Sequence, residues 1–111
     1  YVRSKSEMMI ANILQEHQVP FRYECGLELG NHTFYPDFTL KHPETGEIYY
    51  FEHFGMIDEP KYRSKMLDKL DVYLEYDVRN LIITTETKAR PLTVEQVEHA
   101  LICFEPFEQA S

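Results

Sequence analysis

The sequence predicts an α/β domain of the α+β kind, in which helices cover both faces of a mixed sheet. Apolar residues recur at helical spacing in long segments, and short segments rich in β-branched and aromatic residues lie between turn signals. A chain of 111 residues is long enough for one core and one domain. The expected order of elements is α-β-β-β-α-β-α.

A helix is predicted near the N-terminal end, from about Lys5 to His17. Ser4 and Glu7 have the spacing of a capping box, and the dipeptide Val19-Pro20 ends the segment. The apolar residues of this segment recur every three or four positions, as one buried helix face requires: Met9, Ile10, Ile13 and Leu14.

Three strands are expected next, separated by short turns. They span about Phe21–Leu29, Thr33–Lys41 and Glu47–Phe54. Gly30-Asn31 is a turn signal between the first two strands, and Pro43–Gly46 is typical of a hairpin turn between the second and the third. The second and third strands are therefore expected to pair in antiparallel fashion.

A long helix is predicted from about Glu59 to Tyr76. Asp58 is its expected N-cap, and Pro60 lies in the first turn, where a missing N–H costs nothing. The expected apolar arc of this helix comprises Tyr62, Met66, Leu67, Leu70, Tyr73 and Leu74.

A short buried strand is expected at Asn80–Thr85, which is rich in β-branched residues. Because a helix connects it to the third strand, the two strands should be parallel. Thr93 and Gln96 then cap a last helix, which extends to about Cys103.

Composition narrows the functional classes. Eleven basic and nineteen acidic residues give a net charge of −8, which disfavours simple electrostatic binding of nucleic acid. No segment is apolar enough to span a membrane and no secretory signal opens the chain, so we expect no membrane partner. Cys25 and Cys103 match no metal spacing and indicate a reducing, cytoplasmic location. The first residue is Tyr1, so we expect a piece of a longer protein.

Two acidic residues on the second and third strands carry the most chemical information. With a loop from Pro43 to Gly46, the hairpin register places Asp37 directly opposite Glu52. Facing side chains on one side of an antiparallel pair have Cβ atoms about 4.5–5.5 Å apart, where like charges destabilise a sheet. A hard cation such as Mg²⁺ or Mn²⁺ would compensate this pair. The alternatives are a register shifted by one residue, or an acid solvated at a strand end.

These residues resemble the PD-(D/E)XK nuclease superfamily. Pro36-Asp37, a hairpin and then Glu52 on the next strand are similar to its motif, and the order α-β-β-β-α-β is that of its core. The segment Tyr50–Met56 also resembles nuclease-like domains attached to helicases and DNA-repair proteins. The resemblance implies a restriction-endonuclease-like core and a single nuclease-like domain over residues 1–111.

The resemblance implies a role for each matching residue. Asp37 and Glu52 correspond to the two acids of the motif and would bind the metal, together with the backbone carbonyl of His53, the residue after the second acid. Glu7 corresponds to an acid on the first helix that completes the site, although it also has its capping role. The Lys of the motif should follow Glu52 by two positions, where this chain has Phe54.

A phenyl ring cannot activate water or stabilise a developing negative charge, so a cation must come from elsewhere or catalysis is lost. Related members of the superfamily move the Lys onto the long helix. Here Lys65 and Lys69 lie near the apolar arc of that helix, and the alternative is a merely solvated stripe. The side chain of His53 is a further candidate, but strand alternation directs it to the opposite face.

The implied function is a Mg²⁺- or Mn²⁺-dependent hydrolase that cleaves phosphodiester bonds of nucleic acid, DNA rather than RNA, within a repair, recombination or helicase protein. Its partners would be nucleic acid and other domains of the same chain, and the sequence leaves a homodimer open. The alternative is a degenerate nuclease fold that serves protein interaction or regulation, with Phe54 recording the loss of catalysis. An acidic mimic of DNA is opposed by the intact Asp37 and Glu52.

Overall fold

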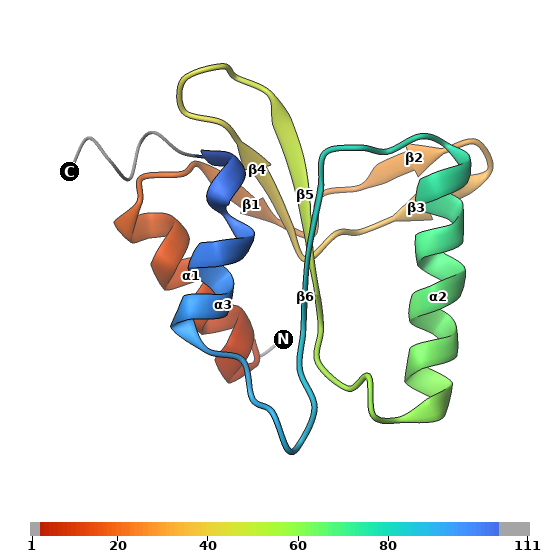
Figure 1. Cartoon of the computed structure of the whole chain (residues 1–111). Helices are drawn as coiled ribbons and strands as arrows, with labels where there is room; N and C mark the ends of the chain where they lie inside the picture. The colour runs from red at the N-terminus through yellow and green to blue at the C-terminus, as the bar shows by residue number, and fades with distance from the viewer. Residues whose placement is uncertain (1–2, 105–111) are drawn as a thin grey trace.

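The computed structural model describes residues 3–104, apart from the side chain of Cys103. A four-stranded mixed sheet, in the order β1-β4-β5-β6, divides the molecule, and a separate two-stranded hairpin is formed by β2 and β3 (Figure 1). The strands are β1 (Phe21–Tyr23), β2 (Leu27–Leu29), β3 (His32–Phe34), β4 (Phe38–Lys41), β5 (Ile48–Phe54) and β6 (Leu81–Thr85).

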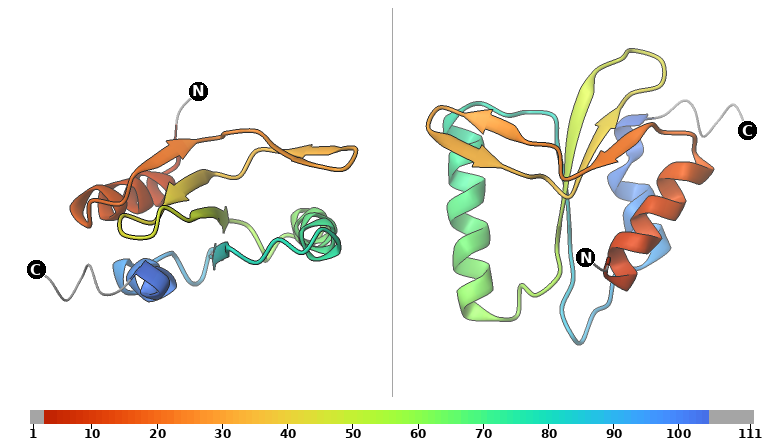
Figure 2. Two further views of the ribbon diagram at one scale, coloured as in Figure 1. Left: turned by 90° about the horizontal axis from the view of Figure 1, so that it is seen from above. Right: turned by 180° about the vertical axis from the view of Figure 1, so that it is seen from behind.

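The helices lie on both sides of the sheet, as predicted for this fold class. α1 (Lys5–Glu16) and α3 (Val94–Ala100) lie side by side on one side, whereas α2 (Pro60–Glu75) and the β2–β3 hairpin lie on the other (Figure 2). A short 3₁₀ helix, η1 (Ile102–Phe104), follows α3, which is therefore shorter than expected. Among residues 3–104, none of the helices has the length and apolar character that crossing a membrane requires.

The main core lies between the sheet and the pair α1 and α3. Both helices begin with the predicted capping boxes, in which a hydroxyl and an N3 side chain satisfy each other's backbone N–H groups. Alternate strand residues point toward these helices. Phe38 packs edge-to-face on Phe51 with the ring centroids 5.9 Å apart, within the range of about 4.5–7 Å that is usual for such pairs. The buried strand residues of this core are Phe38, Leu40, Phe51 and Ile82.

The predicted pairing of the central strands is confirmed. Phe38 faces Phe51 and Lys41 faces Ile48, and the N–H of His42 donates to the carbonyl of Glu47 at 2.8 Å to close the hairpin. β5 and β6 are parallel, as the intervening helix requires.

The first two predicted strands are each broken in the middle. Glu24 adopts a left-handed conformation with φ of 46°, which separates β1 from β2. Pro36 interrupts the second segment between β3 and β4, because proline has no N–H to donate to a ladder. The expected turn between them is present, with Gly30 at φ of 60°. These breaks let the β2–β3 hairpin leave the sheet and approach α2.

α2 differs from the prediction in its N-cap and in part of its expected apolar arc. Glu59 rather than Asp58 is the N-cap, and its Oε2 accepts the N–H of Tyr62 at 2.7 Å. Leu67 and Leu74 are 52% and 75% exposed, so the expected apolar arc is wrong at these positions. The inward face instead includes a charged residue, and the inward-facing residues at helical spacing are Tyr62, Met66, Lys69 and Tyr73.

Candidate active site

Asp37 lies immediately before β4, at the edge of the β4–β5 pair. Continuing the observed register by one residue places it opposite Glu52, as predicted. The Oδ2 atom of Asp37 accepts the backbone N–H of His53 at 2.7 Å, which fixes the carboxylate beside β5. Because β4 begins only at Phe38, the Asp37 side chain takes the place of a strand backbone as the hydrogen-bond partner of the His53 N–H.

The backbone N–H and carbonyl of His53 point toward the Asp37 side of β5. The N–H of Tyr50 donates to β6 at Asn80, and the carbonyl of Phe54 accepts from Glu86 beyond β6. Backbone groups alternate in direction along a strand, so the N–H and carbonyl of His53 both point away from β6. The carbonyl thus lies on the side of the Asp37 carboxylate, where the resemblance implies a metal ligand.

Glu52 is almost completely buried, with 2% of its surface exposed. A buried carboxylate needs partners, and Oε2 has two of them from α2. It accepts a hydrogen bond from the hydroxyl of Tyr73 at 2.6 Å and forms an ion pair with Nζ of Lys69. Burial, followed by the hydrogen bond to Glu52 and its charge, raises the pKa of Tyr73, so its phenol remains a hydrogen-bond donor.

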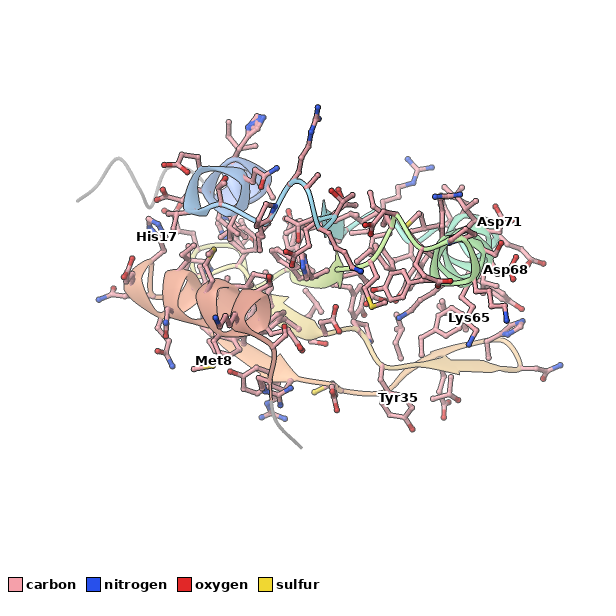
Figure 3. All side chains as sticks on the ribbon, turned by 90° about the horizontal axis from the view of Figure 1, so that it is seen from below. Met8, His17, Tyr35, Lys65, Asp68 and Asp71 are labelled. Atoms are coloured by element: carbon pink, nitrogen blue, oxygen red, sulfur yellow. The ribbon has the colours of Figure 1, made fainter. Side chains whose placement is uncertain are left out.

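Of the two lysines considered for the missing position of the motif, Lys69 is the one that reaches the acids. Its ammonium pairs with Glu52 and lies 5.6 Å from the ring centroid of Phe34. Lys65 lies one turn earlier on α2 and lines a pocket of about 180 Å³ together with Phe54 and Tyr62. In Figure 3, which looks along α2, Lys65 lies on the side of the helix that faces the ribbon of the β2–β3 hairpin, and Asp68 and Asp71 lie on the outer side.

Glu7 retains the capping role that the sequence predicts. Its Oε1 accepts the backbone N–H of Ser4 at 3.2 Å, and its Oε2 lies 3.9 Å from a guanidinium nitrogen of Arg3. Its charge nevertheless contributes to the electrostatics of Asp37. The two roles considered for Glu7 are therefore compatible, but its carboxylate is directed to the cap.

Asp37 is harder to ionise than a solvated aspartate. Burial is the largest cause, and the charges of Glu52 and Glu7 add to it. The N–H of His53 and the ammonium of Lys69 act in the opposite direction. The net effect raises the pKa of Asp37 from its ordinary value of 3.8 to about 6.

The side chain of His53 lies on the opposite face of β5, as alternation predicts. Its Nδ1 is 2.8 Å from the Thr84 hydroxyl, and its Nε2 is 2.7 Å from Oε1 of Glu86. The hydroxyl of Ser6 donates to the same oxygen of Glu86, so this carboxylate joins β5 to the start of α1. Burial raises the pKa of Glu86, but these hydrogen bonds outweigh it and lower the pKa below its usual range.

Tyr73 and Glu86 are the two contributors that sequence reasoning did not identify. Tyr73 was expected only as an apolar residue, although a tyrosine in a helix arc that faces a buried acid has a hydroxyl to place. Glu86 directly follows β6, the strand parallel to β5. Its position after that strand could have predicted that it lies near His53.

Asp37, Glu52 and the carbonyl of His53 are the groups here that could hold a magnesium or manganese ion. Within residues 3–104, no three His, Cys, Asp or Glu side chains converge in metal-ligand geometry. Two carboxylates, Asp37 and Glu52, and the carbonyl of His53 make a small oxygen donor set. Mg²⁺ is commonly held by one or two carboxylates and completes its coordination with water and substrate phosphate.

Comparisons of the chain with protein-family models, with curated proteins and with solved structures gave no match. The interpretation of this site therefore depends on its residues and their geometry.

The shifted pKa of Asp37 predicts a pH-dependent cost to stability. Between about pH 4 and pH 7 the unfolded chain releases the Asp37 proton before the folded domain does, so the contribution of Asp37 to the free energy of unfolding falls as pH rises. A pKa moved from 3.8 to about 6 corresponds to about 3 kcal/mol at neutral pH. Asp37→Asn does not titrate, so its stability relative to the parent should increase by about that amount over this range.

Urea unfolding of both proteins across this pH range, in EDTA, measures the difference. Asp71→Asn, at an exposed position of α2, controls for the loss of one negative charge. A difference between Asp37→Asn and the parent that stays constant with pH contradicts a buried, destabilised carboxylate at position 37.

Proposed function

We propose that this domain is a metal-dependent nuclease that hydrolyses phosphodiester bonds of nucleic acid. The observation that carries the proposal is the ion pair between Lys69 and Glu52. This ion pair supplies an ammonium group beside the two acids, in a chain that has Phe54 at the position of the motif Lys. The PD-(D/E)XK superfamily cleaves phosphodiesters with these groups: two acids, a backbone carbonyl and an ammonium.

The chain's own residues would act by position and charge. Asp37, Glu52 and the carbonyl of His53 would hold Mg²⁺ or Mn²⁺, and the cation, when bound, would activate water and neutralise charge on the scissile phosphate. Lys69 would stabilise negative charge that develops during the reaction. Tyr73 keeps the Glu52 carboxylate in a fixed orientation through its 2.6 Å hydrogen bond.

Nucleic acid is the proposed substrate, with DNA preferred to RNA, and the proposed setting is a repair, recombination or helicase protein in the cytoplasm. The net charge of −8 makes weak affinity of the isolated domain an expected property. Other domains of a longer chain would then supply much of the grip on the substrate.

The first test is metal-dependent cleavage. The domain should cut single-stranded or duplex DNA in the presence of Mn²⁺ or Mg²⁺ and not in EDTA, because the carboxylates need a cation to act on a phosphate. Asp37→Asn and Glu52→Gln should each lose this activity, whereas Asp71→Asn should retain it. The readout is denaturing electrophoresis of labelled DNA. Equal cutting by Asp37→Asn and the parent would contradict the assignment of the site.

The second test separates the two lysines of α2. Lys69→Met keeps the apolar stem but removes the ammonium, and it should lower the single-turnover rate by about 10²-fold, as the loss of one electrostatic stabiliser does. Lys65→Met is the matched control and should keep most of the parent rate, because Lys65 makes no ion pair among the described residues. Circular dichroism verifies that both variants are folded.

If Lys65→Met loses the rate while Lys69→Met keeps it, the proposed role of Lys69 is wrong. If the parent protein binds no divalent cation and cuts no nucleic acid, the alternative applies, in which the fold serves protein interaction or regulation. The burial of Phe54 among the residues facing α2 is the observation that favours this alternative.

A further inference from the structure

A second feature occupies the same face of the sheet as the two acids. A cavity of about 420 Å³ lies on β1, β4 and the start of β5. Its lining combines two cationic side chains and a hydroxyl with apolar residues, and includes Arg22, Lys41, Thr39, Phe21, Cys25 and Ile48. In a domain with a net charge of −8, two basic groups on one cavity are an uneven distribution of charge.

The strand register fixes where this cavity lies relative to the acids. Thr39 faces Arg22 across β1 and β4, and Lys41 faces Ile48 across β4 and β5. Because alternate residues of a strand share a face, Asp37, Thr39 and Lys41 project from the same side of the sheet. At a rise of about 3.3 Å per residue, Thr39 lies roughly 7 Å from Asp37 along the strand and Lys41 roughly 13 Å.

The polar groups of the cavity are able to form hydrogen bonds or ion pairs with a ligand. The Oγ1 atom of Thr39 is buried and has no hydrogen-bond partner within residues 3–104, which is unfavourable unless water or a ligand satisfies it. Arg22 and Lys41 are exposed, and in the described part of the chain neither forms an ion pair. One hydroxyl and two cations, none with a partner among the described residues, together suit an oxyanion.

We propose that this cavity binds a backbone phosphate of the substrate strand next to the phosphate that is cut at Asp37 and Glu52. Arg22 and Lys41 neutralise its charge, and the hydroxyl of Thr39 donates a hydrogen bond to one of its oxygens. The strand then runs along β4, from the acidic end of that face to its basic end. The proposal rests on the proposed nuclease function for the identity of the ligand, but its binding site is separate from the acids.

The test uses binding rather than cleavage. Fluorescence anisotropy of a labelled oligothymidylate, titrated with the domain in Ca²⁺ over a range of salt concentrations, gives Kd and its salt dependence. Each phosphate contact to a single strand contributes about 0.7 to the slope of log Kd against log salt. Arg22→Ala and Lys41→Ala should therefore each weaken binding and reduce the slope by about 0.7, and the double variant by about 1.4.

Arg79→Ala is the matched control, since Arg79 is highly exposed, pairs with Asp77 and lies outside the cavity. It should leave both quantities close to those of the parent. If Arg22→Ala and Lys41→Ala behave as Arg79→Ala does, the proposed site is wrong. Asp37→Asn should still bind the oligonucleotide, so a domain that binds through Arg22 and Lys41 but never cuts contradicts the nuclease proposal alone.

Thr39→Val separates ligand binding from a structural role. Removing a buried hydroxyl that has no partner should leave the melting temperature of the free domain unchanged or higher, while Kd for the oligonucleotide rises. A lower melting temperature with an unchanged Kd shows instead that the hydroxyl supports the fold, and overturns its part in phosphate binding.

Discussion

The facing carboxylates of Asp37, just before β4, and Glu52, in β5, are the constraint around which the rest of the site is built. Asp37 and Glu52 have the same charge and lie opposite each other; Glu52 is buried and Asp37 is half-buried. Each acid has its own compensation, since Asp37 accepts a backbone N–H and Glu52 accepts from a tyrosine and a lysine. The compensation is incomplete, because burial, with the charge of Glu52 adding to it, keeps the pKa of Asp37 well above its ordinary value. A bound cation would favour the ionised form of Asp37 and so offset both effects.

This constraint explains features of the fold that a purely apolar core would not need. α2 presents Lys69 and the hydroxyl of Tyr73 toward the sheet, and the cost is that Leu67 and Leu74 face solvent. β4 begins one residue after Asp37, which leaves the backbone of His53 available to the site. On the other face, the side chain of His53 is fixed by a hydrogen-bond network that holds α1 and the region after β6 in place. The site is thus supported from both faces of β5.

Local signals predicted the parts of the fold that depend on neighbouring residues. The capping boxes, the hairpin turn and the parallel pairing of β5 with β6 follow from short motifs and connection types. The break at Glu24 did not, because a non-glycine residue in the left-handed region has no composition signal. The exposure of Leu67 and Leu74 was not predicted either, since helical periodicity places both in the apolar arc of the helix. The predicted arc did include Tyr73, with Lys69 near it, but only the packed structure shows that both contact Glu52 and that Glu86 reaches His53.

The central claim is that Asp37 and Glu52 share one divalent cation, and direct measurement of Mn²⁺ binding by electron paramagnetic resonance tests it most simply. Bound Mn²⁺ loses the sharp signal of the free ion, so a titration gives the affinity without any substrate. The account predicts saturable binding by the parent and by Asp71→Asn, with strong weakening in Asp37→Asn and in Glu52→Gln. Binding of Mn²⁺ by Asp37→Asn with the affinity of the parent would contradict the account.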